Sequence, residues 1–327
     1  MNFRLLPLAL ALLASAALAD VLKDPQWQAW LDTGKTAELT RAARAKGDDE
    51  QATLALAMAA IDDNDAARLE ASVAPLQACV DRRPASASSP ACHYALGRVY
   101  GQQAMTASVF KMPGLAAKTK EQFVKAVALD PQFFEPRMGL AQFYLIAPGF
   151  AGGSTSKARE LAADAQAHQP EHAKLLRFLV AAQADDLAGA ERELASVKPG
   201  DDRALQRELR NGWMRLGAEF IDQKAFPKAR SLFETVQRDN PQHAAGPYGL
   251  ARVALETAQP DEAVRLLERA RTLEGAERYP IDQRLGQALA AKGDKPGARA
   301  ALERFLQNRR ANPRNIEDAR KLLASLA

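Results

Sequence analysis

The sequence is poor in the residue types that build catalytic and metal sites. Its 327 residues include two cysteines and four histidines, and aromatic residues make up only 6% of the chain. Beyond the N-terminal segment, no apolar run approaches the roughly 20 residues needed to span a bilayer. The net charge of +4 is spread along the chain, and no Lys/Arg block forms a nucleic-acid footprint. We therefore expect neither a membrane-spanning protein nor a nucleic-acid partner.

The first 19 residues have the pattern of a secretory signal. Arg4 precedes an apolar run over 5–14, and small residues at 17–19 precede Asp20. These are the basic, apolar and cleavage regions of a signal peptide, and the run is too short to cross a bilayer. A buried N-terminal helix is the alternative. No cysteine follows the cleavage position, so a lipid anchor is not expected. The sequence predicts a periplasmic or secreted protein cleaved after Ala19.

The two cysteines are Cys79 and Cys92. An even cysteine count in an exported chain indicates a disulfide, which here would close a loop of roughly 14 residues. The bridge would tie two successive helices across a connector. Two buried free thiols are the alternative.

No group of residues indicates catalysis. His168 and His172 have a metal-ligand spacing, but Pro170 between them prevents a shared helical face. The paired aspartates along the chain have no partner that suggests acid–base chemistry. We expect no catalytic residue, no metal site, no cofactor and no enzymatic activity.

The most informative pattern is a spacing between residues 213 and 241. It consists of Trp213-x-x-Leu216-Gly217-x-x-Phe220, then Ala229-x-x-x-Phe233-x-x-Val236, then Pro241. The large residues recur at helical spacing, the small ones let two helices approach closely, and the proline ends the second helix. The segment resembles the tetratricopeptide repeat (TPR), a helix–turn–helix unit of 34 residues.

Weaker copies of this unit precede and follow it. The leucine position of the first helix recurs at Leu96, Leu140, Leu179, Leu216, Leu250 and Leu285. The apolar position of the second helix recurs at Phe123, Ala162, Leu194, Phe233, Leu267 and Leu302. One unit cannot bury its apolar face alone, so the resemblance implies an all-α fold, a right-handed α-solenoid of TPR-like repeats. A related α-solenoid is the structural alternative.

The repeats predict the organisation of the chain. A signal peptide at 1–19 precedes N-terminal capping helices at 20–46, where Asp24 is the expected N-cap of the first helix. A TPR-like array of about seven helix pairs follows at 47–310, and a C-terminal capping helix at 311–327 ends the chain.

Two units carry inserted loops between their helices, near 101–117 and 145–156. Both contain Pro-Gly followed by a large apolar residue and a small one. Pro-Gly favours a type II turn, which would fix the direction of the apolar side chain. Because the loops occupy equivalent places in adjacent repeats, they predict a ridge that grips a partner. Its residues are Leu115, Phe150, Gly152 and Gly153. Alternatively, the two loops only pack on each other.

The resemblance also implies a binding groove, because the first helices of TPR arrays line the concave face. Residues two before and two after each leucine position share one helical face. The predicted partner-binding residues are Tyr94, Arg98, Met138, Gln142, Met214, Tyr248 and Arg252. Tyr and Arg are common anchors of protein interfaces. A solvated groove without a ligand is the alternative.

These features predict a non-enzymatic exported scaffold that binds a protein or peptide partner in the cell envelope through the concave groove. The loop around Phe150 also resembles loops of TPR partners of TRAP-type solute transporters. That resemblance implies an alternative function, an accessory protein of a solute transport system that encloses a small ligand.

Overall fold

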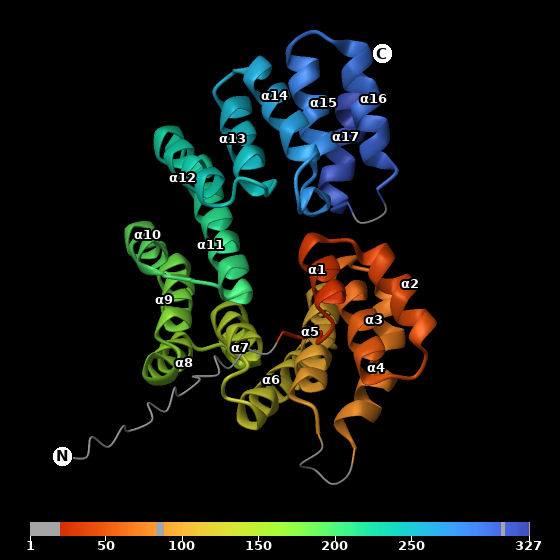
Figure 1. Cartoon of the computed structure of the whole chain (residues 1–327), viewed down its shortest axis with the longest axis vertical. Helices are drawn as coiled ribbons and strands as arrows, with labels where there is room; N and C mark the ends of the chain where they lie inside the picture. Colours follow the sequence, from red (N-terminus) through yellow and green to blue (C-terminus); the bar gives the residue numbers. More distant parts are fainter. Residues whose placement is uncertain (1–19, 83–87, 309–310, 327) are drawn as a thin grey trace, which may run out of the picture.

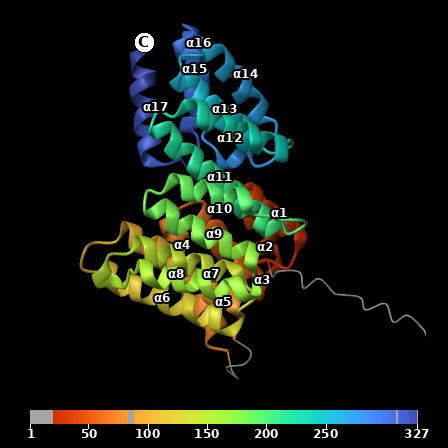
Figure 2. The same cartoon turned by 90° about the vertical axis from the view of Figure 1, so that its left-hand side faces the viewer.

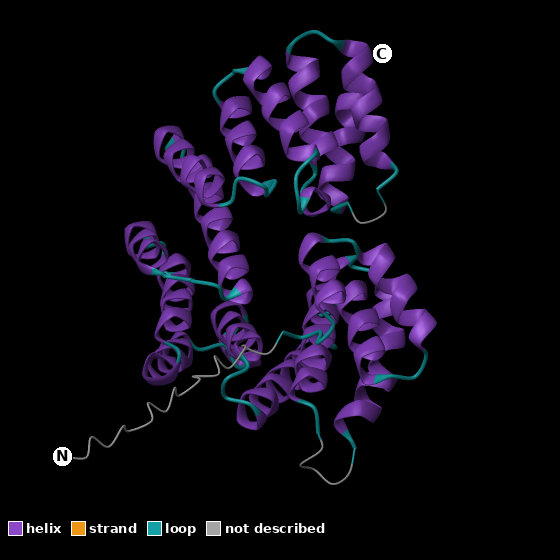
Figure 3. Cartoon of the chain, in the orientation of Figure 1, coloured by secondary structure: helices purple, strands orange, loops and turns teal. Residues whose placement is uncertain are grey.

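The computed structural model describes residues 20–82, 88–308 and 311–326. The predicted signal peptide lies outside these residues. The described residues form seventeen α-helices and two short 3₁₀ helices, with no strand among them (Figures 1 and 3). Each helix from α1 to α16 contacts the next helix along the chain, as in an α-solenoid. The predicted fold class is confirmed.

The first ten helices and the 3₁₀ helix η2 form one half of the array (Figure 1). Their bounds are α1 Pro25–Thr33, α2 Thr36–Lys46, α3 Glu50–Asp62, α4 Ala66–Val80, α5 Pro90–Thr106, α6 Met112–Leu129, α7 Phe134–Ile146, η2 Gly149–Ala151, α8 Thr155–His168, α9 Pro170–Gln183 and α10 Leu187–Ser196. The side chain of Asp24 accepts hydrogen bonds from two backbone N–H groups of α1, the N-cap that the sequence predicts.

The remaining helices form the other half, which begins with the long helix α11. Their bounds are α11 Arg203–Asp222, α12 Phe226–Asp239, α13 Ala245–Glu256, α14 Pro260–Arg271, η3 Ala276–Arg278, α15 Ile281–Ala291, α16 Lys295–Leu306 and α17 Pro313–Ser325. Helices α3 to α16 make seven pairs, and α17 covers the last of them.

The repeated apolar positions form the core of the array. All six leucines of the first helices are at most 5% exposed, and the six second-helix positions at most 4%. They fall on α5, α7, α9, α11, α13 and α15, and on α6, α8, α10, α12, α14 and α16 respectively. Each of these six helix pairs is therefore present, and α3 with α4 forms a further pair before them.

Glycines set the closest helix packing. The ring of Phe233 on α12 is fully buried between Gly217 of α11 and Gly249 of α13. A Cβ atom at Gly217 would lie 2.3 Å from Cζ of Phe233, and one at Gly249 would lie 2.3 Å from its Cδ1. No side chain fits at such distances, so the small residue that the TPR pattern places at Gly217 is required by packing.

The two inserted segments differ from the loops that the sequence predicts. In the first, α5 continues to Thr106 and α6 begins at Met112, so Pro113 and Gly114 belong to a helix. In the second, Gly149 starts η2. Neither glycine after the proline has the positive φ that a type II turn requires, and that prediction is wrong. Proline suits the first turn of a helix because it needs no hydrogen-bond donor there.

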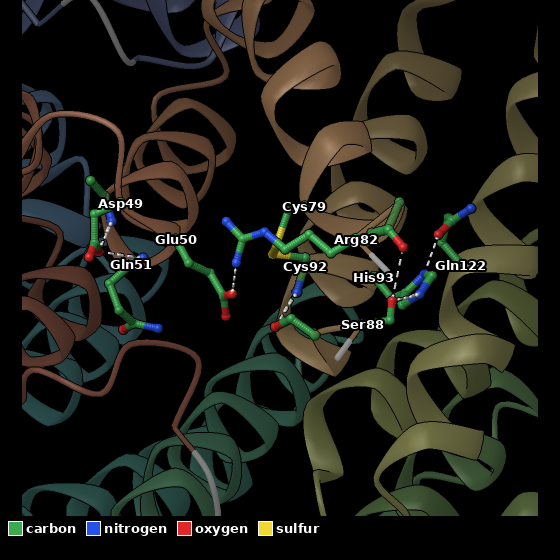
Figure 4. Close-up of a disulfide and its surroundings, with 12 residues drawn as sticks. Asp49, Glu50, Gln51, Cys79, Arg82, Ser88, Cys92, His93 and Gln122 are labelled. Carbon is green, nitrogen blue, oxygen red and sulfur yellow. Dashed lines mark hydrogen bonds and ion pairs between the residues drawn. A yellow bond between two sulfur atoms is a disulfide. The ribbon is translucent and has the colours of Figure 1, made fainter. Parts of the chain in front are cut away.

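A disulfide joins Cys79, at the end of α4, to Cys92 in the first turn of α5 (Figure 4). Both cysteines are buried, and their Cα atoms lie 6.1 Å apart. Arg82, just beyond α4, donates from Nη1 to Oε2 of Glu50 at 2.7 Å and so holds the start of the connector against α3. The predicted bridge is confirmed.

We predict that Gly217→Ala lowers the free energy of unfolding by about 1–3 kcal/mol, because the new methyl group displaces Phe233. This loss should exceed the gain in helix propensity of about 1 kcal/mol. Urea unfolding followed by circular dichroism measures it. Gly114→Ala is the matched control, since a Cβ there meets nothing within 4 Å. Equal midpoints for the two variants would contradict the packing argument.

We predict that reduction of the Cys79–Cys92 bridge lowers the free energy of unfolding by about 3 kcal/mol, because the unfolded chain regains freedom in the opened loop. Urea midpoints with and without reductant measure the effect. The double variant Cys79→Ser/Cys92→Ser should unfold at one midpoint in both conditions. A thiol titration verifies that reduction is complete. If the wild-type midpoint is then the same with and without reductant, the expectation is refuted.

Candidate partner-binding surfaces

The array curves until its C-terminal half meets its first helix (Figure 1). The 3₁₀ helix η3, between α14 and α15, contacts α1. Arg278 of η3 donates from Nε to the carbonyl oxygen of Asp32 at 2.5 Å, and from Nη2 to that of Leu31. The same guanidinium pairs with Asp62 of α3 at 2.9 Å. Arg278 thus gives the Asp32 carbonyl a donor and adds a second donor to the Leu31 carbonyl, which also accepts from the backbone N–H of Gly34.

A second arginine joins three helices inside the curve. Arg207 of α11 donates to Oδ1 of Asp32 on α1 at 2.8 Å and to Oε1 of Glu135 on α7 at 3.2 Å. Burial raises the pKa of Glu135 to about 7, although Arg207 opposes that shift. Burial also disfavours the charge on Arg207, but Asp32, Glu208 and Glu135 together hold its pKa above the ordinary value. We call the bonds of Arg207 and Arg278 to α1 and α3 the closure contacts.

Much of the predicted concave stripe is buried. Tyr94, Met138 and Tyr248 are at most 8% exposed. The hydroxyl of Tyr94 accepts a bond from Arg98 at 2.8 Å, and the Tyr248 ring stacks on Tyr279 at 4.6 Å. The cavity left between α1 and the first helices here measures about 180 Å³.

The other residues of the stripe keep some access to solvent. Gln142 is exposed, and Met214, Arg252 and Arg98 are partly exposed. The structure therefore divides the stripe into a buried part, which supports the closed curve, and an accessible part. Partner binding by these residues stays a prediction.

An open cleft of about 780 Å³ remains beside the closed region. The N-terminal segment and α1 form one wall, α11 forms another, and the α12–α13 connection closes one end. Its cationic and amide side chains include Lys23, Gln28, Arg203, Gln206, Arg210, Asn240 and Gln242, and its carboxylates are Asp20, Asp32 and Glu274.

Arg210 is the unusual member of this cleft. Its Nη1 donates to Oδ1 of Asn240 at 3.2 Å, and it makes no ion pair with a carboxylate of the described residues. Burial lowers its pKa below the ordinary value, since the surrounding carboxylates lie too far away to compensate. A largely buried guanidinium with only an amide partner can bind an anionic group that enters the cleft.

The arginines of this cleft were not predicted, because the repeat motif in the sequence begins only at Trp213. Helix α11 begins ten residues earlier, at Arg203. Arg210 lies four residues before Met214, so the predicted stripe continues onto it. The basic residues at 203, 207 and 210, at helical spacing before the motif, were the signal that could have revealed this surface.

A ridge of exposed apolar side chains lies elsewhere, at the α5–α6 and α7–α8 connections. Phe110 is 92% exposed and Phe150 is 78% exposed. We call the exposed side chains of these two connections the hairpin-end ridge. They are Met105, Val109, Phe110, Ile146 and Phe150.

The four residues predicted for this ridge have different roles. Phe150 projects into solvent, whereas Leu115 is partly buried against the N-terminal core. Gly152 has a φ of +99°, and a Cβ at Gly153 would lie 1.8 Å from the carbonyl oxygen of Ala147. The two glycines shape the backbone that presents Phe150. Phe110 was not among the predicted ridge residues.

The described residues contain one cluster with the spacing of metal ligands, formed by Glu50 with Cys79 and Cys92. The two sulfur atoms are bonded to each other, so they do not offer thiolates to a metal. None of the described helices combines the length and apolar character needed to cross a bilayer.

A family comparison identifies the repeat. Residues 220–279 match the model of the tetratricopeptide repeat. The chain carries tetratricopeptide repeats. The matched TPR segment extends from the end of α11 to η3, and it includes Phe233 and the connection that closes the cleft. This match confirms the TPR resemblance that the sequence motif indicates. TPR arrays generally act as non-catalytic scaffolds.

Solved structures with similar folds include a TPR protein from Parabacteroides merdae, with 16% identity and a TM-score of 0.47 over 89% of this chain and 98% of that one. The APC/C hetero-tetramer Cut9–Hcn1 matches at 17% identity and a TM-score of 0.44, over 89% and 52% of the two chains. Yeast Tom70 matches at 15% identity and a TM-score of 0.39, over 91% and 79%. No curated protein matches the chain.

One group in the cleft titrates in an accessible range. His243 is buried, and its Nδ1 accepts a hydrogen bond from the backbone N–H of Ala245 at 3.1 Å. Burial, with the nearby charges of Arg210 and Arg278, lowers the pKa of His243 to about 4. In the unfolded chain the pKa is about 6.5. As the pH falls below 6.5, the unfolded state therefore gains a proton that the folded state does not bind.

We predict that the wild-type protein loses stability between pH 7 and pH 4 partly through this residue, by up to about 3 kcal/mol. His243→Gln should show a correspondingly shallower decline. Urea midpoints at several pH values measure the difference. His168→Gln, at an exposed position, should decline like the wild type. Parallel curves for His243→Gln and the wild type would disprove the assignment.

Proposed function

We propose that the chain is a non-enzymatic scaffold, exported to the cell envelope, which binds a protein or peptide partner. The TPR repeats, which display surfaces and rarely carry chemistry, support the scaffold role. The disulfide supports export, because such bridges persist in oxidising compartments. The pattern of residues 1–19 adds to the argument for export.

The observation that carries the proposal is the cleft beside α11. It measures about 780 Å³, and Arg210 enters it without a carboxylate partner among the described residues. Amide groups of Gln206, Asn240 and Gln242 line the same cleft and can pair with a peptide backbone. An extended peptide segment with an acidic side chain or a terminal carboxylate fits this chemistry.

The accessible part of the concave stripe extends this surface. Met214 lies one helical turn beyond Arg210 on α11, and both face the inside of the curve. Tyr94 and Tyr248 are poor positions for a test, because their burial means that substitution would disturb the core. Arg210 is a better probe, since its loss removes one charge and leaves the repeat packing intact.

The transport alternative has less support. It requires an enclosed cavity beside Phe110, Leu115 and Phe150, because a small ligand is held by burying most of its surface. A cleft of about 730 Å³ does lie next to Phe110 and Leu115. Phe110 and Phe150, however, project into solvent and do not close it.

We predict that Arg210→Gln recovers at least tenfold less of the partner than wild-type bait, since a charge-assisted hydrogen bond contributes about 1.5–3 kcal/mol. Native affinity capture from extracts of the source organism, followed by quantitative mass spectrometry, measures recovery. Arg215→Gln is the matched control, because Arg215 lies exposed on the same helix outside the cleft. Equal recovery by both variants would remove the cleft as the binding surface.

A further inference from the structure

The exposed apolar surface of this protein is concentrated in one place. Seven large apolar side chains are exposed among the described residues, and five of them belong to the hairpin-end ridge. The other two, Val124 and Leu129, are less than half exposed and lie on α6. Scattered apolar residues are normal on a surface, but a group that protrudes from two adjacent hairpins needs an explanation.

The two hairpin ends lie side by side. Helix α6 contacts both α7 and η2, and the two connections occupy the same edge of the molecule (Figure 2). A Cβ atom at Gly152 would lie 3.3 Å from Nζ of Lys120, so the second connection approaches α6 closely. The ridge is therefore one surface made of two loops, with Phe110 on one and Phe150 on the other.

Cations outnumber carboxylates around the ridge. Residues 101–120 and 138–159, which form the two hairpin ends, contain no Asp or Glu, but Glu121 and Glu160 directly follow them and Glu70 lines the cleft beside Phe110. The two hairpin ends carry five cations: Lys111, Lys118, Lys120, Lys157 and Arg159. Lys118 lies over the Tyr100 ring at 5.2 Å, and Lys157 over the Tyr144 ring at 5.7 Å. These contacts hold two of the ammonium groups beside the ridge.

This combination distinguishes a lipid surface from a protein partner. The cores of protein interfaces are depleted of lysine and enriched in Tyr, Trp and Arg. The ridge has the opposite composition, with Phe, Ile, Val and Met surrounded mainly by lysine. Apolar side chains that enter the interface, with lysines that meet anionic headgroups, are the pattern of peripheral membrane binding.

We propose that the hairpin-end ridge docks the protein on an anionic lipid bilayer. Phe110 and Phe150 enter the interface between headgroups and acyl chains, and the five cations lie against the lipid phosphates. The protein remains outside the hydrocarbon core. This surface uses none of the residues of the cleft, so it does not depend on the proposed partner binding.

The test is vesicle co-sedimentation of the chain from residue 20 onward. One set of vesicles is pure phosphatidylcholine, and the other contains about one-third phosphatidylglycerol. We expect the protein to partition at least tenfold more strongly onto the anionic vesicles, and to dissociate as salt is raised. The double variant Phe110→Ser/Phe150→Ser should partition onto the anionic vesicles at least tenfold less strongly than the wild type.

Two control variants sharpen the result. Val124→Ser/Leu129→Ser removes exposed apolar residues outside the ridge and should bind like the wild type. Arg210→Gln should also bind vesicles normally, which separates this surface from the cleft. Far-UV circular dichroism verifies that each variant is folded.

Three outcomes would overturn the proposal. One is equal binding to neutral and anionic vesicles, or to neither. Another is wild-type binding by the double phenylalanine variant. The third is a concentration-dependent dimer that Phe110→Ser/Phe150→Ser abolishes while vesicle binding is absent, since the ridge would then pair two copies of the chain.

Discussion

The contact between the two ends of this helical array rests on a few charged groups. Each helix of the solenoid contacts its neighbours in sequence, and such packing alone leaves the two ends of the array independent. Arg207 changes this, because one guanidinium bonds Asp32 of α1 and Glu135 of α7 from a position on α11. Removal of either carboxylate leaves part of a buried cation without its partner, which is costly in a low-dielectric interior.

Packing inside the curve decides which surfaces remain for binding. Tyr94 of α5 packs against Phe123 and Phe133, and Tyr248 of α13 stacks on Tyr279, so these inward-facing side chains belong to the core. The accessible surfaces are the cleft that opens beside Arg210 and the ridge at the two hairpin ends. They differ in chemistry, since the cleft presents guanidinium and amide groups and the ridge presents apolar side chains with lysines. In the two functions we propose, one scaffold binds a peptide partner at the cleft and a lipid bilayer at the ridge.

Much of the fold could be predicted from the sequence because TPR packing is local. The contact between Gly217 and Phe233 is made within a single repeat. The leucine position of each first helix is likewise fixed within one repeat and recurs along the chain. The disulfide was also predictable, since two cysteines in a chain with an apparent export signal leave one pairing. Local signals were less reliable at Pro113, where the same Pro-Gly that suits a turn also suits the first turn of α6.

The candidate surfaces were harder to predict because they depend on contacts between distant segments. Nothing near Tyr94 in the sequence indicates that its ring is buried against Phe123 and Phe133. The role of Arg278 is equally hidden, since its partners lie more than two hundred residues earlier. Arg210 was missed for a simpler reason, namely that α11 begins ten residues before the repeat motif.

The closure contacts also bear on how the chain acquires its structure. Local contacts between successive helices form quickly, whereas contacts across long loops form late. The bonds from Arg207 to Asp32 and from Arg278 to Leu31 span 175 and 247 residues. Two of the last carbonyl groups of α1 accept bonds from a residue synthesised far later. Helix α1 is thus synthesised long before its contact with η3 can form, because that contact needs residue 278.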